Sequence, residues 1–224
     1  MANCTPASNE GTGSTTVPVK QVLFDLGGVL VTLDPQQRVD CFLEICGIGV
    51  DQVNAFLDSD LPPRFSTGKL DGEEFYREAK IFFNGDLRKS DLRNCWNRLI
   101  ADAIPANLEA ARRLSHADYQ VGLLSNTDPW HWEYISSHIL ISDELQPVFT
   151  SFELGLEKPE RRLFRIVSEA LACLPDEILL IDDSRQNLET ARSCGWQVCQ
   201  YESVPQLHSL VAGMIAQQQK YDVN

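Results

Sequence analysis

The 224-residue chain lacks any hydrophobic run of the roughly 18 residues that a membrane-spanning helix needs. Its first residues also lack the basic and then apolar pattern of a secretory signal. Basic residues are few, since 19 lysines and arginines stand against 32 aspartates and glutamates, for a net charge of −13. Nucleic acids and anionic membranes are bound through basic surfaces, so this deficit argues against both as partners. We therefore expect a cytoplasmic protein that binds no nucleic acid and no membrane.

Paired cysteine motifs are also missing. The chain has seven cysteines, an odd number, and no two of them are spaced as C-x-x-C. Several lie within apolar patterns. Reduced, buried thiols are therefore the expected state, ahead of a zinc site or a disulfide framework.

Short apolar runs and helical patterns alternate over most of the chain. The first run, Val22–Phe24, ends at Asp25 and precedes a turn that Gly27 and Gly28 permit. Further runs with strand character are Val121–Leu124, Val148–Phe149, Ile178–Ile181 and Val198–Tyr201. The helical patterns are Asn107–Leu114, Trp130–Ile139, Glu160–Leu171 and Asn187–Cys194. This alternation predicts an α/β fold with a doubly wound parallel sheet.

Two segments depart from the alternation. Residues 1–18 are rich in Ser, Thr, Gly, Asn and Pro and predict a disordered tail. Residues 35–105 have helical periodicity and no convincing strand, and Asp71 with Glu74 three residues later predicts a helix start. We expect a small helical insert over 35–105, placed between two parts of the core, 19–34 and 106–224.

Polar residues follow the predicted strands where each one ends. Asp25 ends the first strand, Ser125 and Asn126 end the second, and Asp182 and Asp183 follow Ile178–Ile181. Lys158 lies in the loop after Val148–Phe149. Ligands of doubly wound sheets bind at the carboxyl ends of the strands, so these groups should share one cleft. A carboxylate nucleophile, a Mg²⁺ ion between carboxylates and a lysine beside a phosphate are all suited to phosphoryl transfer.

These segments resemble the four motifs of the haloacid dehalogenase superfamily. The first is Phe24-Asp25-Leu26-Gly27-Gly28, the second Leu124-Ser125-Asn126-Thr127, the third Lys158-Pro159 and the fourth Ile181-Asp182-Asp183-Ser184. The insert is similar to the helical cap of many members. The branch that the chain most resembles comprises small-sugar phosphatases. The resemblance implies a Mg²⁺-dependent phosphatase that hydrolyses a small phosphorylated metabolite through an aspartyl phosphate.

The resemblance also implies a role for each residue. Asp25 attacks phosphorus and ligates Mg²⁺ together with Asp183 and the backbone carbonyl of Gly27. Asp182 holds Lys158 or the waters of the metal. Phosphate is bound by Ser125, Asn126 and Lys158.

Gly27 departs from the pattern of typical phosphatase members, which carry a second Asp at this position. That Asp protonates the leaving oxygen and then activates water, a general acid–base role worth roughly 10²–10⁴ in rate. His131 and Asp128, just after the second motif, are candidate substitutes, with Asp34 a weaker one. A packing role for His131 is the competing interpretation.

Gly27 leaves alternative functions open. A metal-independent 2-haloacid dehalogenase also lacks the second Asp, but such enzymes do not have a paired carboxylate like Asp182-Asp183. A protein that binds phosphate but has lost most of its turnover is a second alternative. A phosphomutase is a third, although mutases of this family generally use the missing Asp. The pattern does not determine the substrate or the oligomeric state.

Overall fold

The core of the molecule is a five-stranded parallel sheet. The computed structural model describes residues 17–221 except 86 and 140–144. The strands are β1 (Gln21–Phe24), β4 (Gln120–Ser125), β5 (Val148–Thr150), β6 (Ile178–Asp182) and β7 (Gln197–Gln200). Their order is β5-β4-β1-β6-β7, with every neighbouring pair parallel. The predicted doubly wound sheet is confirmed, and β1 lies at its centre, where ligand sites of such sheets form.

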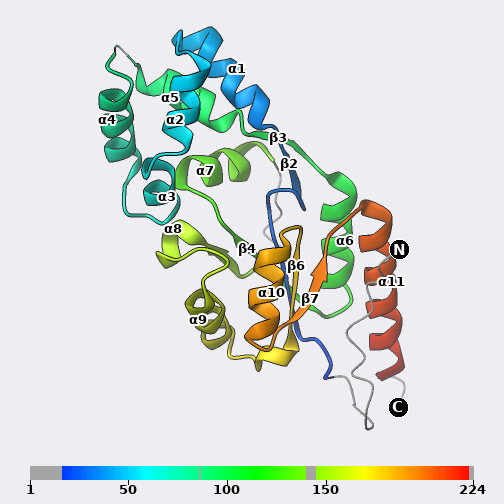
Figure 1. The fold of residues 1–224 in the computed structure, drawn as a ribbon. Coiled ribbons are helices and arrows are strands. Elements are labelled where there is room, and N and C mark those ends of the chain that lie inside the picture. Colours follow the sequence, from blue (N-terminus) through cyan, green and yellow to red (C-terminus); the bar gives the residue numbers. More distant parts are fainter. Residues whose placement is uncertain (1–16, 86, 140–144, 222–224) are drawn as a thin grey trace.

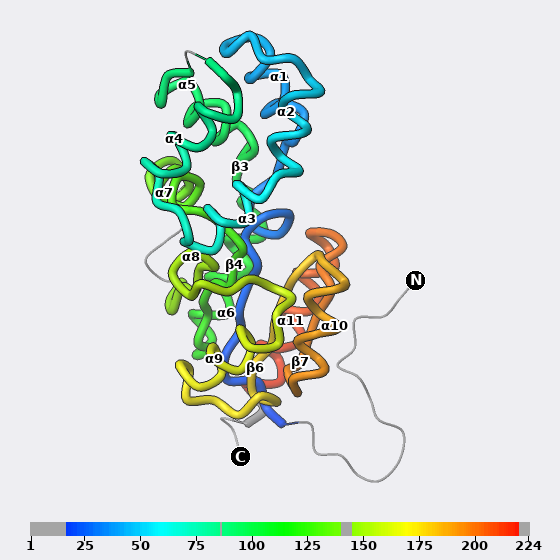
Figure 2. The backbone as a smooth tube through the Cα atoms, turned by 60° about the vertical axis from the view of Figure 1, so that its left-hand side comes forward, coloured from blue at the N-terminus to red at the C-terminus, as the bar shows by residue number. Residues whose placement is uncertain are grey.

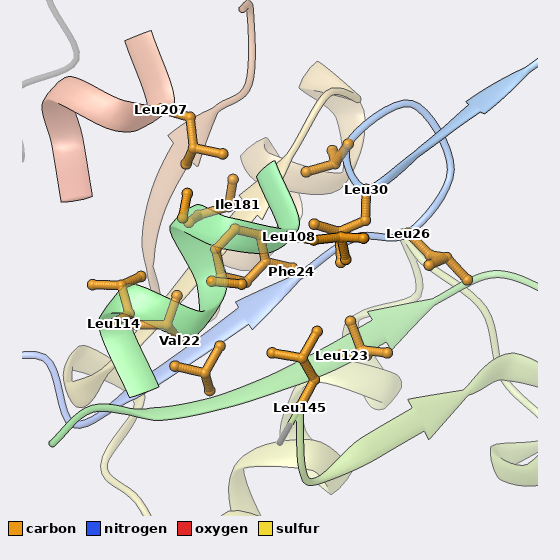
Figure 3. Packing of buried hydrophobic residues seen from close by; sticks show 14 of the residues in the cluster. Val22, Phe24, Leu26, Leu30, Leu108, Leu114, Leu123, Leu145, Ile181 and Leu207 are labelled. Atoms are coloured by element: carbon orange, nitrogen blue, oxygen red, sulfur yellow. The ribbon is translucent and has the colours of Figure 1, made fainter. Parts of the chain in front are cut away.

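Helices cover both faces of this sheet (Figure 1). α6 (Pro105–Ser115) and α11 (Val204–Tyr221) lie on one face, and α9 (Arg161–Leu171) and α10 (Arg185–Ser193) lie on the other. α7 (Pro129–His138) and α8 (Ser151–Leu154) lie toward the end of the molecule that contains residues 35–105 (Figure 1), and a 3₁₀ turn, η1, is formed by Pro175–Glu177. Side chains of β1 alternate between the two faces. Val22 and Phe24 pack with Leu114 of α6 and Leu207 of α11 (Figure 3), whereas Leu23 packs on the opposite side in the cluster of α9 and α10. Strands buried on both faces read as continuous apolar runs, which is why the sequence revealed them.

Five further helices form a cap at one end of the molecule (Figure 2). They are α1 (Pro35–Cys46), α2 (Val50–Leu57), α3 (Leu61–Ser66), α4 (Gly72–Phe82) and α5 (Lys89–Asn97). Their apolar faces enclose a separate cluster that is rich in aromatic rings, in which Phe65 and Phe75 stack with centroids 4.2 Å apart. The start predicted at Asp71 is confirmed, because Asp71 and Glu74 form a reciprocal capping box at the beginning of α4.

The chain enters and leaves the cap through a two-stranded antiparallel ribbon. β2 (Val31–Leu33) pairs with β3 (Ile100–Ala103). The expectation that residues 35–105 contain no strand is therefore wrong at Ile100–Ala103. Four residues with one large apolar side chain give too little periodicity to reveal a strand, and the pairing depends on β2, about 70 residues earlier in the chain.

Two cysteines of the cap form a disulfide, contrary to the expectation of reduced thiols. Cys41 of α1 is bonded to Cys95 of α5 across 54 residues, and Cys46 Sγ lies 3.9 Å from Cys95 Sγ. The pairing could not be recognised from spacing, because only the folded cap brings these two helices together. Among the described residues, Cys173 and Cys194 are free thiols.

Two other expectations concern the ends and the surroundings of the chain. The predicted disordered tail over residues 1–18 lies, up to residue 16, outside the described residues. Within the described part of the chain, none of the helices has both the length and the apolar character that crossing a membrane requires.

Candidate active site

Asp25 lies directly after β1, at the carboxyl edge of the sheet. Its Oδ1 accepts hydrogen bonds from the Leu26 backbone N–H at 2.7 Å and from Lys158 Nζ at 2.9 Å. Its Oδ2 makes no hydrogen bond with any described residue, so one carboxylate oxygen is open to a ligand. Burial raises the pKa of Asp25 to about 6; the charge of Lys158 offsets part of this effect and that of Asp182 adds to it.

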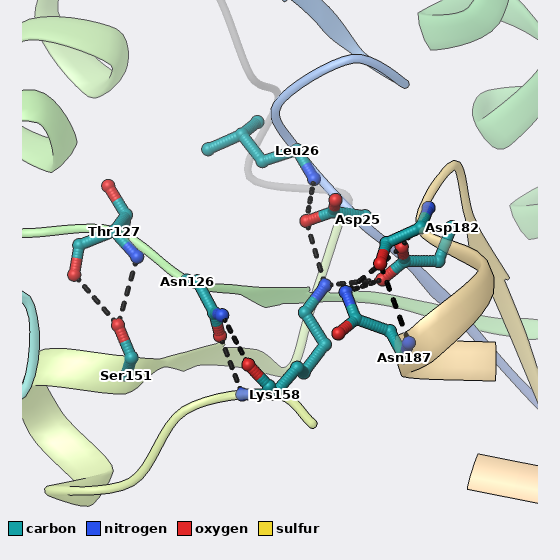
Figure 4. Close-up of polar contacts among 9 residues, drawn as sticks. Asp25, Leu26, Asn126, Thr127, Ser151, Lys158, Asp182 and Asn187 are labelled. Carbon is teal, nitrogen blue, oxygen red and sulfur yellow. Dashed lines mark hydrogen bonds and ion pairs between the residues drawn. The ribbon is translucent and has the colours of Figure 1, made fainter. Parts of the chain in front are cut away.

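Lys158 joins the two carboxylates of neighbouring strands (Figure 4). Its Nζ lies 2.9 Å from Asp25 Oδ1 and 2.6 Å from Asp182 Oδ2, and the residue is only 3% exposed. Burial alone would lower the lysine pKa, but the two carboxylates outweigh it and hold that pKa above its usual value. The group is therefore a fixed cation next to Asp25.

The Asn126 side chain holds the backbone of Lys158 at both of its polar groups. Asn126 Nδ2 donates to the Lys158 carbonyl oxygen at 2.8 Å, and the Lys158 backbone N–H donates to Asn126 Oδ1 at 2.8 Å. This clamp crosses from the end of β4 to the loop that carries Lys158. It leaves the Asn126 side chain committed to that loop (Figure 4).

Asp182 is fully buried and has several partners. Besides Lys158, it accepts a hydrogen bond from the Ser184 backbone N–H at 2.8 Å and from Asn187 Nδ2 at 3.1 Å to each oxygen. Asn187 was missed by the sequence reasoning. The available signal was its place three residues after Ser184, whose side chain caps the start of α10. An Asn in that first turn points back toward the strand end, which brings it to Asp182 (Figure 4).

Asp25, Asp182 and Asp183 could hold a metal ion together. One carboxylate oxygen of each lies within 4.8 Å of the others. Burial and the charge of Asp182 raise the pKa of Asp183, so this cluster repels itself without a cation. The oxygens of Asp182 are already occupied, which leaves those of Asp25 and Asp183. Carboxylate ligands of this kind, completed by water and phosphate, suit Mg²⁺.

The loop that carries Gly27 lies against Asp183. A side chain at Gly28 would place its Cβ only 2.3 Å from Asp183 Oδ2, and Gly28 has the left-handed φ of +77°. The loop is closed by the Gly28 backbone N–H, which donates to the Val31 carbonyl oxygen at 2.8 Å. A glycine is thus required at position 28 both because Asp183 approaches its Cα closely and because its φ is left-handed.

The loop after β4 presents a free hydroxyl near this centre. Ser125 is buried at the end of β4, and its side chain makes no hydrogen bond with the described residues. The next turn is fixed, because Ser151 Oγ accepts from the Thr127 backbone N–H at 2.9 Å and donates to the Thr127 carbonyl oxygen at 2.8 Å. An unpartnered hydroxyl on a fixed loop is suited to binding an oxyanion.

The candidate substitutes for the missing acid are engaged elsewhere. His131 Nδ1 lies 2.6 Å from Asp128 Oδ2, and His131 Nε2 lies 2.9 Å from the Trp96 carbonyl oxygen. Asp128 caps α7 and accepts from Trp96 Nε1 at 2.9 Å, whereas Asp34 caps α1. Both ring nitrogens of His131 and both oxygens of Asp128 thus have structural partners, which favours the packing interpretation of His131.

Known phosphatases are similar to this chain in sequence, although no family model matches it. A D-ribitol-5-phosphate phosphatase of Bacteroides thetaiotaomicron is 24% identical over 192 residues, which cover 83% of this chain and 93% of that enzyme. A sesquiterpene phosphatase of Aspergillus oryzae is 23% identical over 178 residues, which cover 79% of this chain and 86% of that enzyme.

Solved structures share the fold. A HAD family enzyme of Bacteroides thetaiotaomicron, in a magnesium complex, has a TM-score of 0.76 and 26% identity, covering 83% of this chain and 94% of that chain. The same enzyme with magnesium and inorganic phosphate gives a TM-score of 0.75 and 25% identity, covering 82% and 94%. An L-2-haloacid dehalogenase of Xanthobacter autotrophicus gives 0.56 and 20%, covering 88% and 84%. These matches support the resemblance to the haloacid dehalogenase superfamily that the four motifs and the capped parallel sheet indicate.

Proposed function

We propose that the protein is a Mg²⁺-dependent phosphatase that hydrolyses a small phosphorylated metabolite, with sugar phosphates as the first class to test. The observation that carries the proposal is the open Oδ2 of Asp25, which lies beside the fixed cation Lys158 and within the carboxylate cluster. The names of the two curated relatives support a phosphoric monoester hydrolase. The magnesium complexes of the Bacteroides enzyme support the metal.

The first chemical step uses Asp25 as the nucleophile. Its Oδ2 attacks phosphorus, the P–O bond to the leaving group breaks, and an aspartyl phosphate forms. Water then attacks the phosphorus of this intermediate, releases inorganic phosphate and restores Asp25. A pKa of about 6 leaves the carboxylate ionised at neutral pH, as a nucleophile requires.

The remaining residues bind and position. Lys158 neutralises charge on phosphate and on Asp25, and Asp182 with Asn187 holds Lys158 in place. Ser125 donates its hydroxyl to a phosphate oxygen, and Asn126 fixes the Lys158 loop while its backbone remains the group that can face phosphate. Mg²⁺, held by Asp25, Asp183 and the carbonyl of Gly27, would supply further positive charge to the phosphate oxygens. In this proposal residues 35–105 are the cap, and 19–34 with 106–224 are the core.

The dehalogenase alternative is less well supported. The similarity to the haloacid dehalogenase shows the fold alone. The clustered carboxylates of Asp25, Asp182 and Asp183 are the feature that favours a metal-dependent reaction. A dehalogenase would retain its activity in a chelator, whereas the proposed phosphatase would lose it.

The test is a screen of phosphorylated metabolites with and without Mg²⁺, with Asp25→Asn as the blank. We expect hydrolysis that requires both the metal and Asp25. Hydrolysis at the wild-type rate by purified Asp25→Asn protein would remove the nucleophile assignment. Binding of phosphate analogues without any turnover would instead support a phosphate-binding protein that has lost the acid.

A further inference from the structure

Arg38, on the first helix of the cap, is a half-buried cation that has no acidic partner among the described residues. Its guanidinium makes no ion pair and no hydrogen bond with any residue between 17 and 221 that the structure describes, and its Nε is fully enclosed. It lies over the ring of Trp96, 5.4 Å from the centroid. Two other arginines of the cap differ, because Arg64 pairs with Glu78 and Arg93 with Glu133. The two Nη groups are not among the fully enclosed atoms and have no partner among the described residues, so they are the donors that a ligand can reach.

Asp128, the acidic group whose charge acts on Arg38, is already engaged by other donors. Asp128 is close enough to influence Arg38, yet its Oδ1 already accepts from the Trp130 and His131 backbone N–H groups. Its Oδ2 accepts from Trp96 Nε1 and lies 2.6 Å from His131 Nδ1. Burial lowers the pKa of Arg38, and the charge of Asp128 offsets only part of this. The guanidinium therefore keeps its donors available on the cap side of the boundary between cap and core.

Two segments next to the proposed phosphate site, one after Asp25 and one after Ser125, continue to the surroundings of Arg38. The side chain of Leu33 lies against Gly27, two residues after Asp25, and α1 with Arg38 begins directly after this strand. On the other side, Asp128 follows Ser125 by three residues. Both segments that border the proposed phosphate site therefore continue to the surroundings of Arg38.

We propose that Arg38 binds oxygen atoms of the leaving group, and that the substrate is the phosphate ester of a polyol or sugar and not of a hydrocarbon. A guanidinium has five N–H donors and no acceptor, so hydroxyl oxygens complement it. A hydrocarbon chain would leave these donors buried and unpaired. The inference rests on the proposed phosphatase function. It also separates the two kinds of substrate for which the curated relatives are named, a pentitol phosphate and a sesquiterpene phosphate.

The experiment compares three esters in the full chain with Mg²⁺: ribitol 5-phosphate, farnesyl phosphate and 4-nitrophenyl phosphate. Arg38→Met keeps an unbranched side chain over Trp96 but removes the donors, and Arg38→Lys keeps the charge. Arg93→Met is the matched control, because Arg93 also lies over a tryptophan, Trp130, at 5.9 Å but is already paired. The readout is the ratio of kcat/KM for ribitol 5-phosphate to that for 4-nitrophenyl phosphate within each variant, so that the fraction of folded protein cancels.

The wild type should prefer ribitol 5-phosphate to farnesyl phosphate. The ratio should fall about 10- to 100-fold in Arg38→Met, the range expected for the loss of a charged hydrogen bond, and recover in part in Arg38→Lys. It should stay at the wild-type value in Arg93→Met. An unchanged ratio in Arg38→Met, or a wild type that prefers farnesyl phosphate, would overturn the inference. If no ester is cleaved by the wild type, it is the proposed function that fails.

Discussion

Gly27 is the residue at which this site departs most from typical phosphatases of the haloacid dehalogenase superfamily, which it resembles. A Cβ at Gly27 would lie 3.0 Å from Leu33 Cδ1, so Leu33 takes up space that an acid would need. Leu33 is 43% exposed and can move aside. With no acid at this position, aryl phosphates, whose phenolate leaves readily, should be cleaved much faster than alkyl phosphates.

Gly27→Asp should raise the turnover of alkyl phosphates, by up to the roughly 100-fold effect of a positioned general acid. Adding Leu33→Ala should increase the gain, because it makes room for the new carboxylate. Steady-state kinetics with an alkyl and an aryl phosphate measures both effects, and Leu33→Ala alone is the control. Equal rates for the two esters in the wild type would show that another group already supplies the proton.

Gly28 offers a sharper test of the metal site. Gly28→Ala would drive its Cβ into Asp183 Oδ2, at a φ of +77° that disfavours alanine. We expect Mg²⁺ affinity to fall at least tenfold, as measured by calorimetric titration. Gly47→Ala is the matched control, since Gly47 has a φ of +67° but nothing within 4 Å of its Cβ position. The metal assignment to Asp183 loses its support if both variants bind Mg²⁺ like the wild type.

At the scale of elements, one buried carboxylate joins the cap to the core. Asp128 caps α7 of the core, binds Trp96 Nε1 of α5 and contacts His131. Burial by itself raises the pKa of Asp128, but the charge and hydrogen bonds of His131 and the bond from Trp96 outweigh it and hold that pKa below its usual value. The carboxylate therefore stays ionised and keeps three partners satisfied at once.

Asp128→Ala should lower the free energy of unfolding by about 3–5 kcal/mol, because it leaves a buried His131 and Trp96 without their acceptor. Urea denaturation measures this loss. Asp71→Ala is the control, since Asp71 caps α4 on an exposed surface and its removal should cost about 1 kcal/mol. Equal losses in the two variants would mean that Asp128 acts as a helix cap and no more.

Elements of the core could be predicted from the sequence where a pattern is local. Runs such as Val22–Phe24 and Ile178–Ile181 are apolar throughout, because both of their faces are covered. Pairings between distant segments could not be predicted. The ribbon of β2 and β3 and the disulfide between Cys41 and Cys95 exist only after the cap has folded. α11, which packs on α6, was also missed.

Some residues of the candidate site could likewise be predicted from the sequence, and others could not. Asp25, Lys158 and Asp182 were recognisable because each follows a predicted strand, and parallel strands end at one edge. Asn187 was not recognisable as a site residue, since an Asn near the start of a helix is usually interpreted as a capping residue. Arg38 was not either, because only its enclosed Nε, which has no partner among the described residues, distinguishes it from other arginines.

At the scale of the whole molecule, the site gathers negative charge in a chain that already carries −13. The folded-state pKa of Asp25 is about 6, above the ordinary value of roughly 3.9. Between these two values the folded protein holds a proton that the unfolded chain has released. The metal-free fold should therefore lose stability as pH rises through this window, because ionised Asp25 is buried near Asp182.

This linkage predicts how Asp25→Asn and Mg²⁺ act on thermal stability. At pH 7.5 without metal, Asp25→Asn should be more stable than the wild type by on the order of 3 kcal/mol, and at pH 4 most of the difference should disappear. Millimolar Mg²⁺ should raise the Tm of the wild type by several degrees at pH 7.5, because it binds only the native state. At pH 4 this rise should disappear, since protonated carboxyls do not ligate the ion.

Asp183→Asn separates the effect of Mg²⁺ on stability from the effect of the buried charge of Asp25. Asp183 is exposed, so its substitution should change the metal-free Tm less than Asp25→Asn does, yet it should abolish the stabilisation by Mg²⁺. Thermal melts followed by circular dichroism, at both pH values with and without the ion, give all of these comparisons. A wild-type Tm that is indifferent to Mg²⁺ at pH 7.5, together with activity that survives a chelator, would favour the dehalogenase reaction. A metal effect that persists in Asp183→Asn would move the ion to other ligands.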